Sequence, residues 1–150
     1  MNIVNSALQG KGRRKNIIYL IVLIMFFTST NFLKFGGLVL VVVGLLGFVG
    51  IIGPTSSQSL FGAFWWFDNY ENVVHLLLGI VGLVVAFALP MSLHKPVTLL
   101  VGVLALFFAL YNLFSVNFLG ANLESPADLV LHTVVAAWAL YSSLGNKSSM

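Results

Sequence analysis

The chain has 150 residues, of which 59% are hydrophobic and only 7% are charged, whereas roughly a quarter of the residues are charged in an ordinary soluble domain. Seven Lys or Arg and four Asp or Glu leave a formal net charge of +3, and so few ionic groups cannot cover the surface of a soluble globule. The composition therefore predicts an integral membrane protein and excludes a soluble monomer. Because the chain has no cysteine, disulfides, thiolate metal sites and cysteine lipidation are excluded as well.

The first 35 residues contain a basic cluster and an apolar segment. The cluster consists of Lys11, Arg13, Arg14 and Lys15, and its place directly before apolar residues is typical of a membrane-topology signal, not of a nucleic-acid-binding face. We expect no nucleic-acid partner. The apolar segment covers residues 17–33, but its dense part, from Ile17 to Phe27, has only 11 residues. A run this short fits a signal-like, interfacial or re-entrant segment, or a short additional span.

Four longer apolar segments follow, each close to the roughly 20 residues that a helix needs to cross the hydrocarbon core. They cover residues 36–53, 71–90, 97–116 and 128–145. We therefore predict an all-α membrane protein with a four-helix transmembrane bundle over residues 36–150, preceded by the hydrophobic segment within residues 1–35. In the alternative with five spans, that first segment also crosses the membrane and a very tight turn falls at residues 34–37.

The charged residues predict the orientation, because Lys and Arg accumulate in cytoplasmic loops. With four spans, the N-terminal basic cluster, Lys34, Lys95 and Lys147 all lie on one side, and all four acidic residues lie on the other. This distribution favours four spans over five. It predicts a multi-pass protein of the cell membrane, the prokaryotic inner membrane, with both termini in the cytoplasm.

The loops differ in character. Residues 54–70 are rich in aromatic side chains and include Trp65 and Trp66, which predicts an interfacial stretch, since Trp and Tyr concentrate at the headgroup level. Residues 115–127 are polar and end at Ser125 and Pro126, as expected of a solvated connection. His94 lies in the short loop between the second and third spans, where we expect it to be solvated.

The spans predict an internal repeat in which residues 36–90 correspond to residues 97–145. In the first half, Asp68 and Glu71 precede His75; in the second, Ser125 and Asp128 precede His132. Asp68 and Ser125 are expected to cap helices, each with an acid at the third helical position and a histidine one turn further along. The two histidines should therefore lie at matched depth in the outer half of the membrane.

We call the side chains that this repeat brings together the His/acid cluster, and we expect Tyr111 or Asn112 to approach it. Its members are Glu71, Asn72, His75, Asp128 and His132. Three interpretations are open. The first is structural: each imidazole bonds its own acid and ties helices together. The second is a cofactor, either haem iron between axial His75 and His132, or a transition metal with Glu71 and Asp128 as further ligands or as partners of the ligands. The third is a proton or ion relay, since His titrates near neutral pH.

A haem macrocycle lies best against small residues, which near the two histidines are Gly79, Gly82, Ala136 and Ala137. More generally, a series of Gly and Ala side chains in the spans, including Gly44, Gly47, Gly102 and Ala105, predicts close contacts between helices in lipid. Such faces also allow the bundle to form a homo-oligomer or to join a larger membrane complex.

Three features of the chain form a pattern: residues 72–79, which begin one helix and contain His75; residues 127–132, which begin another and contain His132; and Gly44 and Gly47 in the span before residues 72–79. In these features the sequence resembles a family of small multi-pass bacterial and archaeal membrane proteins known as domain of unknown function 4383. The resemblance covers about residues 36–145. It implies a four-span fold and a pairing of His75 with His132, and it implies no reaction, since the family has no established molecular activity.

No sequence motif points to an enzyme. The chain lacks a Gly-x-Ser-x-Gly nucleophile elbow, a His-Glu-x-x-His zinc motif, a phosphate-binding loop and a dinucleotide fingerprint. We therefore expect a structural or accessory membrane protein whose first partner is the lipid bilayer. The alternative is a haem- or metal-binding membrane protein that uses His75 and His132.

Overall fold

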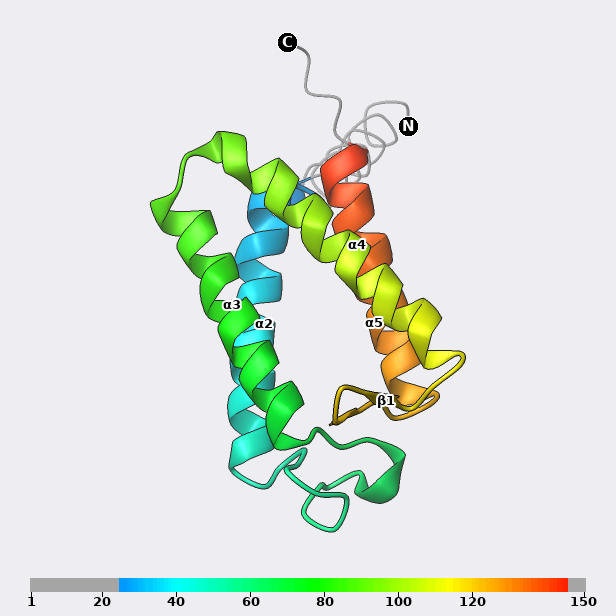
Figure 1. The fold of residues 1–150 in the computed structure, drawn as a ribbon. Coiled ribbons are helices and arrows are strands. Elements are labelled where there is room, and N and C mark those ends of the chain that lie inside the picture. The colour runs from blue at the N-terminus through cyan, green and yellow to red at the C-terminus, as the bar shows by residue number, and fades with distance from the viewer. Residues whose placement is uncertain (1–24, 146–150) are drawn as a thin grey trace, which may run out of the picture.

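The computed structural model describes residues 25–145. It contains four long helices, two short 3-10 helices and one two-stranded hairpin (Figure 1). In chain order the elements are α2 (Ser29–Phe48), η1 (Gly62–Phe64), α3 (Asn69–Ala88), η2 (Met91–Leu93), α4 (His94–Asn112), β1 (Asn117–Phe118), β2 (Ala121–Asn122) and α5 (Ala127–Leu144). All four α-helices are long and apolar enough to cross a membrane, which confirms the predicted all-α membrane protein with four spans in the described part of the chain.

The four helices pack as two pairs. α2 lies along α3, and α4 lies along α5, with fewer contacts between the pairs (Figure 1). Each pair is a span, a loop and a returning span, as the predicted halves require. That the two halves are repeats of one another stays a prediction.

The first described span starts earlier than predicted. α2 begins at Ser29 and ends at Phe48, so residues 34–37 lie inside a continuous helix and the tight turn of the five-span alternative is wrong at that place. Thr28 caps the helix, since its side chain accepts a hydrogen bond from the Asn31 amide. Residues 17–24 of the predicted N-terminal segment, like the N-terminal basic cluster, lie outside the described residues.

The second, third and fourth spans fall close to the predicted ranges, but His94 does not lie in a solvated loop. It is the first residue of α4 and is only 4% exposed. Its Nδ1 atom lies 2.8 Å from the Thr30 hydroxyl of α2. The expectation of a solvated His94 is therefore wrong, because η2 leads directly into α4 and leaves no free loop around this residue.

Glycine makes the close approach of α2 and α3 possible. A Cβ atom on Gly37 would lie 3.0 Å from the Gly79 carbonyl oxygen, and one on Gly79 would lie 2.7 Å from the Gly37 carbonyl oxygen. In the other pair, a Cβ atom on Gly102 would lie 3.0 Å from the Leu140 side chain. These contacts confirm that the small residues of the spans form helix–helix interfaces.

The two ends of the bundle carry opposite charge. α2 and α4 begin at one end, which we call the basic end because Lys34 lies in the second turn of α2 and Lys95 in the first turn of α4. α3 and α5 begin at the other end, which we call the acidic end because it holds all four Asp and Glu residues of the chain.

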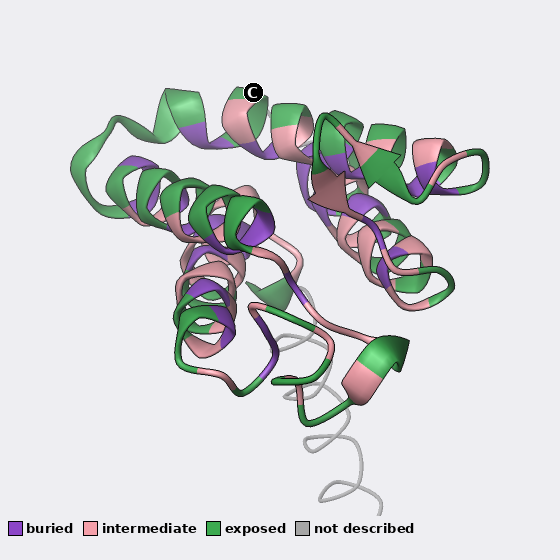
Figure 2. Cartoon of the chain, turned by 60° about the horizontal axis from the view of Figure 1, so that its bottom comes forward, coloured by how far each residue is buried: buried purple, intermediate pink, exposed green. Residues whose placement is uncertain are grey.

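The buried apolar core of the bundle lies toward the basic end. It consists of Phe32, Leu33, Val85, Ala86 and Ala139, with partly buried side chains of α4 and α5 packed against it. The outward faces of all four helices are exposed and rich in large apolar side chains (Figure 2). In a bilayer, these faces contact lipid.

Candidate functional site

The His/acid cluster lies at the acidic end, where α3 starts with a complete capping box. The Asp68 carboxylate accepts hydrogen bonds from the backbone amides of Tyr70 (2.7 Å) and Glu71 (2.9 Å). In return the Glu71 carboxylate, which is buried, accepts one from the Asp68 amide at 3.1 Å. The predicted cap at Asp68 is therefore confirmed, and the side-chain oxygens satisfy amides that have no partner within the helix.

α5 starts differently from the prediction. Its cap residue is Pro126 and no side chain caps it, so the expected cap at Ser125 is wrong. Asp128 replaces it, because its fully buried carboxylate turns back and accepts a hydrogen bond from the Glu124 amide at 2.6 Å. Helical side chains tilt toward the N-terminus, which directs both Glu71 and Asp128 toward the loop before the helix.

The bonds of the two carboxylates to loop amides separate each acid from its histidine. His132 Nδ1 lies 2.8 Å from the backbone carbonyl oxygen of Asp128, not from its carboxylate. His75 Nδ1 is buried and has no hydrogen-bond partner in the described part of the chain. The predicted hydrogen bonds between each histidine and its own acid are therefore absent from the described residues, because the carboxylates point away from the imidazoles one turn deeper.

Two hydrogen bonds join the helix pairs at the acidic end. Trp65, in the loop between α2 and α3, donates from Nε1 to the Asp128 carboxylate of α5 at 3.1 Å. The Asp68 carboxylate at the start of α3 accepts a hydrogen bond from the Asn122 amide of the β1–β2 hairpin at 2.6 Å. Each pair thus contributes one carboxylate that binds a donor of the other pair.

Each of the two histidines lies against an aromatic side chain of its own helix pair. The ring of His75 lies against Phe67, with centroids 4.8 Å apart, and that of His132 against Phe108, with centroids 5.6 Å apart. The two helices that carry these histidines start at the same end of the bundle, so the structure places the predicted residues of α3 and α5 at the acidic end.

Within residues 25–145, no three His, Asp or Glu side chains converge closely enough to hold a metal ion. The carboxylates of Glu71 and Asp128 are instead bound to backbone amides and to Trp65.

Asn72 of the His/acid cluster, and Asn112 and Tyr111 near it, form hydrogen bonds to backbone carbonyls of the loops. Asn72 is fully buried, donates weakly to the Phe67 carbonyl at 3.4 Å and faces Gly47 of α2. Asn112 donates to the Leu123 carbonyl at 3.0 Å, and the Tyr111 hydroxyl to the Asn117 carbonyl at 3.0 Å. These three side chains position the loops, and no hydrogen bond connects them to either imidazole.

The small residues considered for a macrocycle are divided between interfaces and surface. A Cβ atom on Gly79 or on Gly82 would meet backbone atoms of α2. Ala136 is buried and Ala137 is exposed. Gly79 and Gly82 therefore serve the α2–α3 interface.

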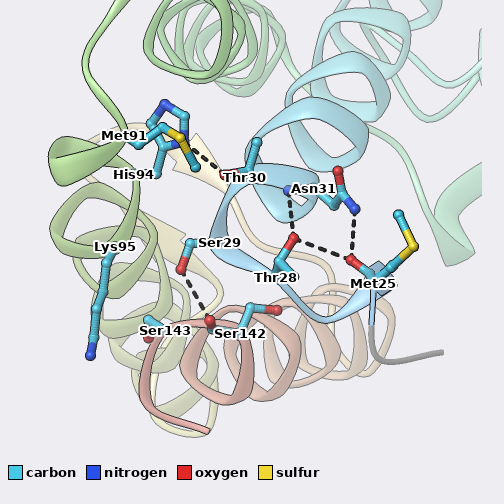
Figure 3. Close-up of a pocket in the computed structure, with 10 residues that line it drawn as sticks. All are labelled: Met25, Thr28, Ser29, Thr30, Asn31, Met91, His94, Lys95, Ser142 and Ser143. Carbon is cyan, nitrogen blue, oxygen red and sulfur yellow. Dashed lines mark hydrogen bonds between the residues drawn. The ribbon is translucent and has the colours of Figure 1, made fainter. Parts of the chain in front are cut away.

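A second polar cluster, at the basic end, was not predicted. The Ser29 hydroxyl of α2 donates to the Ser142 carbonyl of α5 at 3.0 Å, and the Thr98 hydroxyl of α4 to the Ser29 carbonyl at 3.3 Å. Together with the contact between Thr30 and His94, these bonds join α2 to both helices of the other pair. Beside them lies a pocket of about 450 Å³ (Figure 3). The only signal in the sequence was the polar run at residues 28–31, which the prediction assigned to the end of an apolar segment.

Comparison with known proteins adds no relative: no family model, no curated protein and no solved structure matches this chain.

Proposed function

We propose that this chain is a small structural or accessory membrane protein in which Asp128 of the His/acid cluster, together with the capping residue Asp68, fixes the arrangement of two helix pairs. The observation that carries the proposal is the hydrogen bond from Trp65 to Asp128, together with the bond from Asn122 to Asp68. Both bonds are made by carboxylates, and hydrogen bonds to charged groups are stronger than those between neutral groups. The apolar core lies toward the basic end, so these polar bonds hold the acidic end.

The charge distribution supports an orientation for this protein. Lys34 and Lys95 lie at the basic end, and the four acids lie at the acidic end. By the positive-inside rule the basic end faces the cytoplasm. The His/acid cluster then lies in the outer leaflet of the membrane, which we take to be a prokaryotic inner membrane.

A double-mutant cycle tests the structural role of the cluster. Trp65→Phe removes the donor, and Asp128→Ala removes the acceptor. We expect the two changes to be coupled by about 1–3 kcal/mol, the range for a hydrogen bond to a charged group. The measurement is the free energy of unfolding in mixed micelles titrated with a denaturing detergent. The matched control is Trp66→Phe, since Trp66 has no hydrogen bond within the described residues. Coupling below about 0.5 kcal/mol for Trp65, or equal coupling for Trp66, would contradict the proposal.

One observation favours a second candidate function, the binding of haem or a metal ion by His75 and His132. His132 is held through Nδ1 by a backbone carbonyl, the usual arrangement of a metal-binding histidine, which leaves Nε2 free. His75 Nδ1 has no partner among the described residues. The residues present thus supply two nitrogen ligands and no carboxylate that is free to join them.

Absorption spectroscopy separates the two candidates. The full chain is purified in mild detergent from cells supplied with a haem precursor and trace metals, and its visible spectrum and metal content are measured. A cofactor role predicts a Soret band or near-stoichiometric metal that disappears in both His75→Ala and His132→Ala. A folded, colourless and metal-free protein would contradict that role and leave the structural one.

A further inference from the structure

The pocket at the basic end is lined mostly by residues of polar types, although most of its accessible surface is apolar, and the proposed function does not use it. It lies between the starts of α2 and α4 and the end of α5 (Figure 3). Of the ten described residues that line it, five are serine or threonine, and the others are Asn31, His94, Lys95 and two methionines. The hydroxyls of Thr28, Ser29 and Ser143 and the amide of Asn31 already donate within the chain, which leaves Lys95, His94 and Ser142 as the side-chain donors that the chain does not use.

The electrostatics of this pocket favour an anion. None of the described lining residues is acidic. All four Asp and Glu side chains lie at the acidic end, and the helices between that end and the pocket have 18 to 20 residues. The acids are therefore about 27–30 Å from the pocket along the bundle. Lys95 contributes a positive charge from the exposed rim. The first turn of α2 also lines the pocket, and its N-terminal amides and dipole favour negative charge.

Two deeply buried polar side chains of the lining have no hydrogen-bond partner in the described part of the chain. They are His94, which is 4% exposed and unpartnered at Nε2, and Ser142, which is 1% exposed and unpartnered at its hydroxyl. Figure 3 shows them on opposite sides of the pocket, one from α4 and the other from α5. Buried polar groups are rarely left without a partner, so each of these side chains has a hydrogen-bonding capacity that the chain itself does not use.

The remaining contacts of His94 orient its ring. Its Nδ1 atom lies 2.8 Å from the Thr30 hydroxyl. When that hydroxyl donates to Nδ1, the ring proton is on Nε2, which becomes a donor. On the facing side, the carbonyl oxygen of Ser142 accepts a bond from the Ser29 hydroxyl. This bond partly compensates the negative partial charge of the oxygen and weakens its repulsion of an anion.

We propose that this pocket binds a phosphate group, supplied either by the headgroup of an anionic lipid or by free phosphate. A phosphate offers several strong acceptor oxygens to the donors of Lys95, His94, Ser142 and the first turn of α2. The pocket lies at the helix ends, which is the depth of lipid phosphates in a bilayer. Its volume of about 450 Å³ exceeds that of a single phosphate and leaves room for the glycerol part of a headgroup.

Thermal unfolding of the full chain in a neutral maltoside detergent tests this proposal, because a ligand that binds the folded state raises the midpoint in a saturable way. Three probes are added separately: short-chain dihexanoyl phosphatidylglycerol, dihexanoyl glycerol, which has the same chains without phosphate, and inorganic phosphate against chloride of equal ionic strength. We expect phosphatidylglycerol to raise the midpoint and dihexanoyl glycerol to leave it unchanged. A rise with inorganic phosphate shows that free phosphate suffices, and its absence assigns the site to the lipid headgroup.

Variants connect the effect to the pocket. Lys95→Gln and Ser142→Ala should each weaken the apparent affinity about tenfold, as expected for the loss of one hydrogen bond to a charged group. Lys34→Gln is the charge-matched control, since Lys34 lies outside the pocket with its ammonium 5.1 Å from the ring centroid of Phe87. If no phosphate probe raises the midpoint, or if Lys34→Gln weakens binding as much as Lys95→Gln, the proposal is wrong.

Discussion

Replacement of Gly47 by alanine should destabilise the protein through a single side chain, Asn72. An alanine Cβ atom at position 47 would lie 1.7 Å from the Asn72 Oδ1 atom, 2.3 Å from Cγ and 2.6 Å from Nδ2. Asn72 is fully buried and its amide donates to the Phe67 carbonyl. The amide therefore has to move when Cβ is added, and it cannot move into solvent.

The size of the effect follows from three contributions. Overpacking of a buried contact costs about 1–3 kcal/mol, and loss of the bond from Asn72 to Phe67 costs about 0.5–1.5 kcal/mol more. The exchange of glycine for alanine in a helix returns at most about 1 kcal/mol. We expect Gly47→Ala to lower the free energy of unfolding by about 0.5–4.5 kcal/mol.

A second change isolates the cause. In the background of Asn72→Ala the amide is gone, so Gly47→Ala should be neutral or stabilising by up to about 1 kcal/mol. The coupling between the two positions is then about 2 kcal/mol or more. The assay is unfolding in mixed micelles followed by tryptophan fluorescence and circular dichroism. Gly36→Ala is the control in the same helix, because a Cβ atom there would meet only atoms at 3.8 Å or beyond. If Gly47→Ala is as harmless as Gly36→Ala, or is equally damaging without Asn72, the steric reasoning fails.

Two further predictions use the same protein. Because the chain has no cysteine, single cysteines introduced into it report its orientation directly. A membrane-impermeant maleimide added to intact spheroplasts should label Leu60→Cys, at a position where the native side chain is 79% exposed, and should label Lys95→Cys only after lysis. The reverse labelling pattern would contradict the proposed topology. Thr30→Val leaves His94 Nδ1 without its partner and should lower the free energy of unfolding by about 1–3 kcal/mol. The control Ser143→Ala removes only a bond to Leu140 within α5 and should lower it less. Equal losses would show that the bond between α2 and α4 stabilises the protein no more than a bond within one helix.

The spans were predictable because each one is a continuous apolar run in the sequence. The exception is the start of the first described span, α2, and it has a physical reason. The prediction ended one apolar segment near Lys34 and began the next at residue 36, since a cation inside a span is costly. In the structure Lys34 lies in the second turn of α2 with its ammonium over the Phe87 ring, 5.1 Å from the centroid. A long stem and an aromatic partner let the helix continue through this residue.

The candidate site was predictable where its contacts are local. The capping box of Asp68 and Glu71 involves residues three apart, a spacing that helix geometry fixes. The bond from Trp65 to Asp128 joins residues 63 apart, and the contact of Thr30 with His94 joins residues 64 apart. Neither separation leaves a periodic signal, so the partner of Asp128 and the burial of His94 required the fold.

The division of the bundle into pairs has a consequence for its biosynthesis. Every glycine-mediated contact between α2 and α3 lies within residues 29–88, so the first hairpin contains its own interface and can close in the membrane before α4 has left the ribosome. The second hairpin closes in the same way, and the bonds between the hairpins can form only afterwards. Changes such as Gly47→Ala should thus act on an early assembly intermediate, whereas changes at Trp65 or Asp128 should act on the docking of two finished halves.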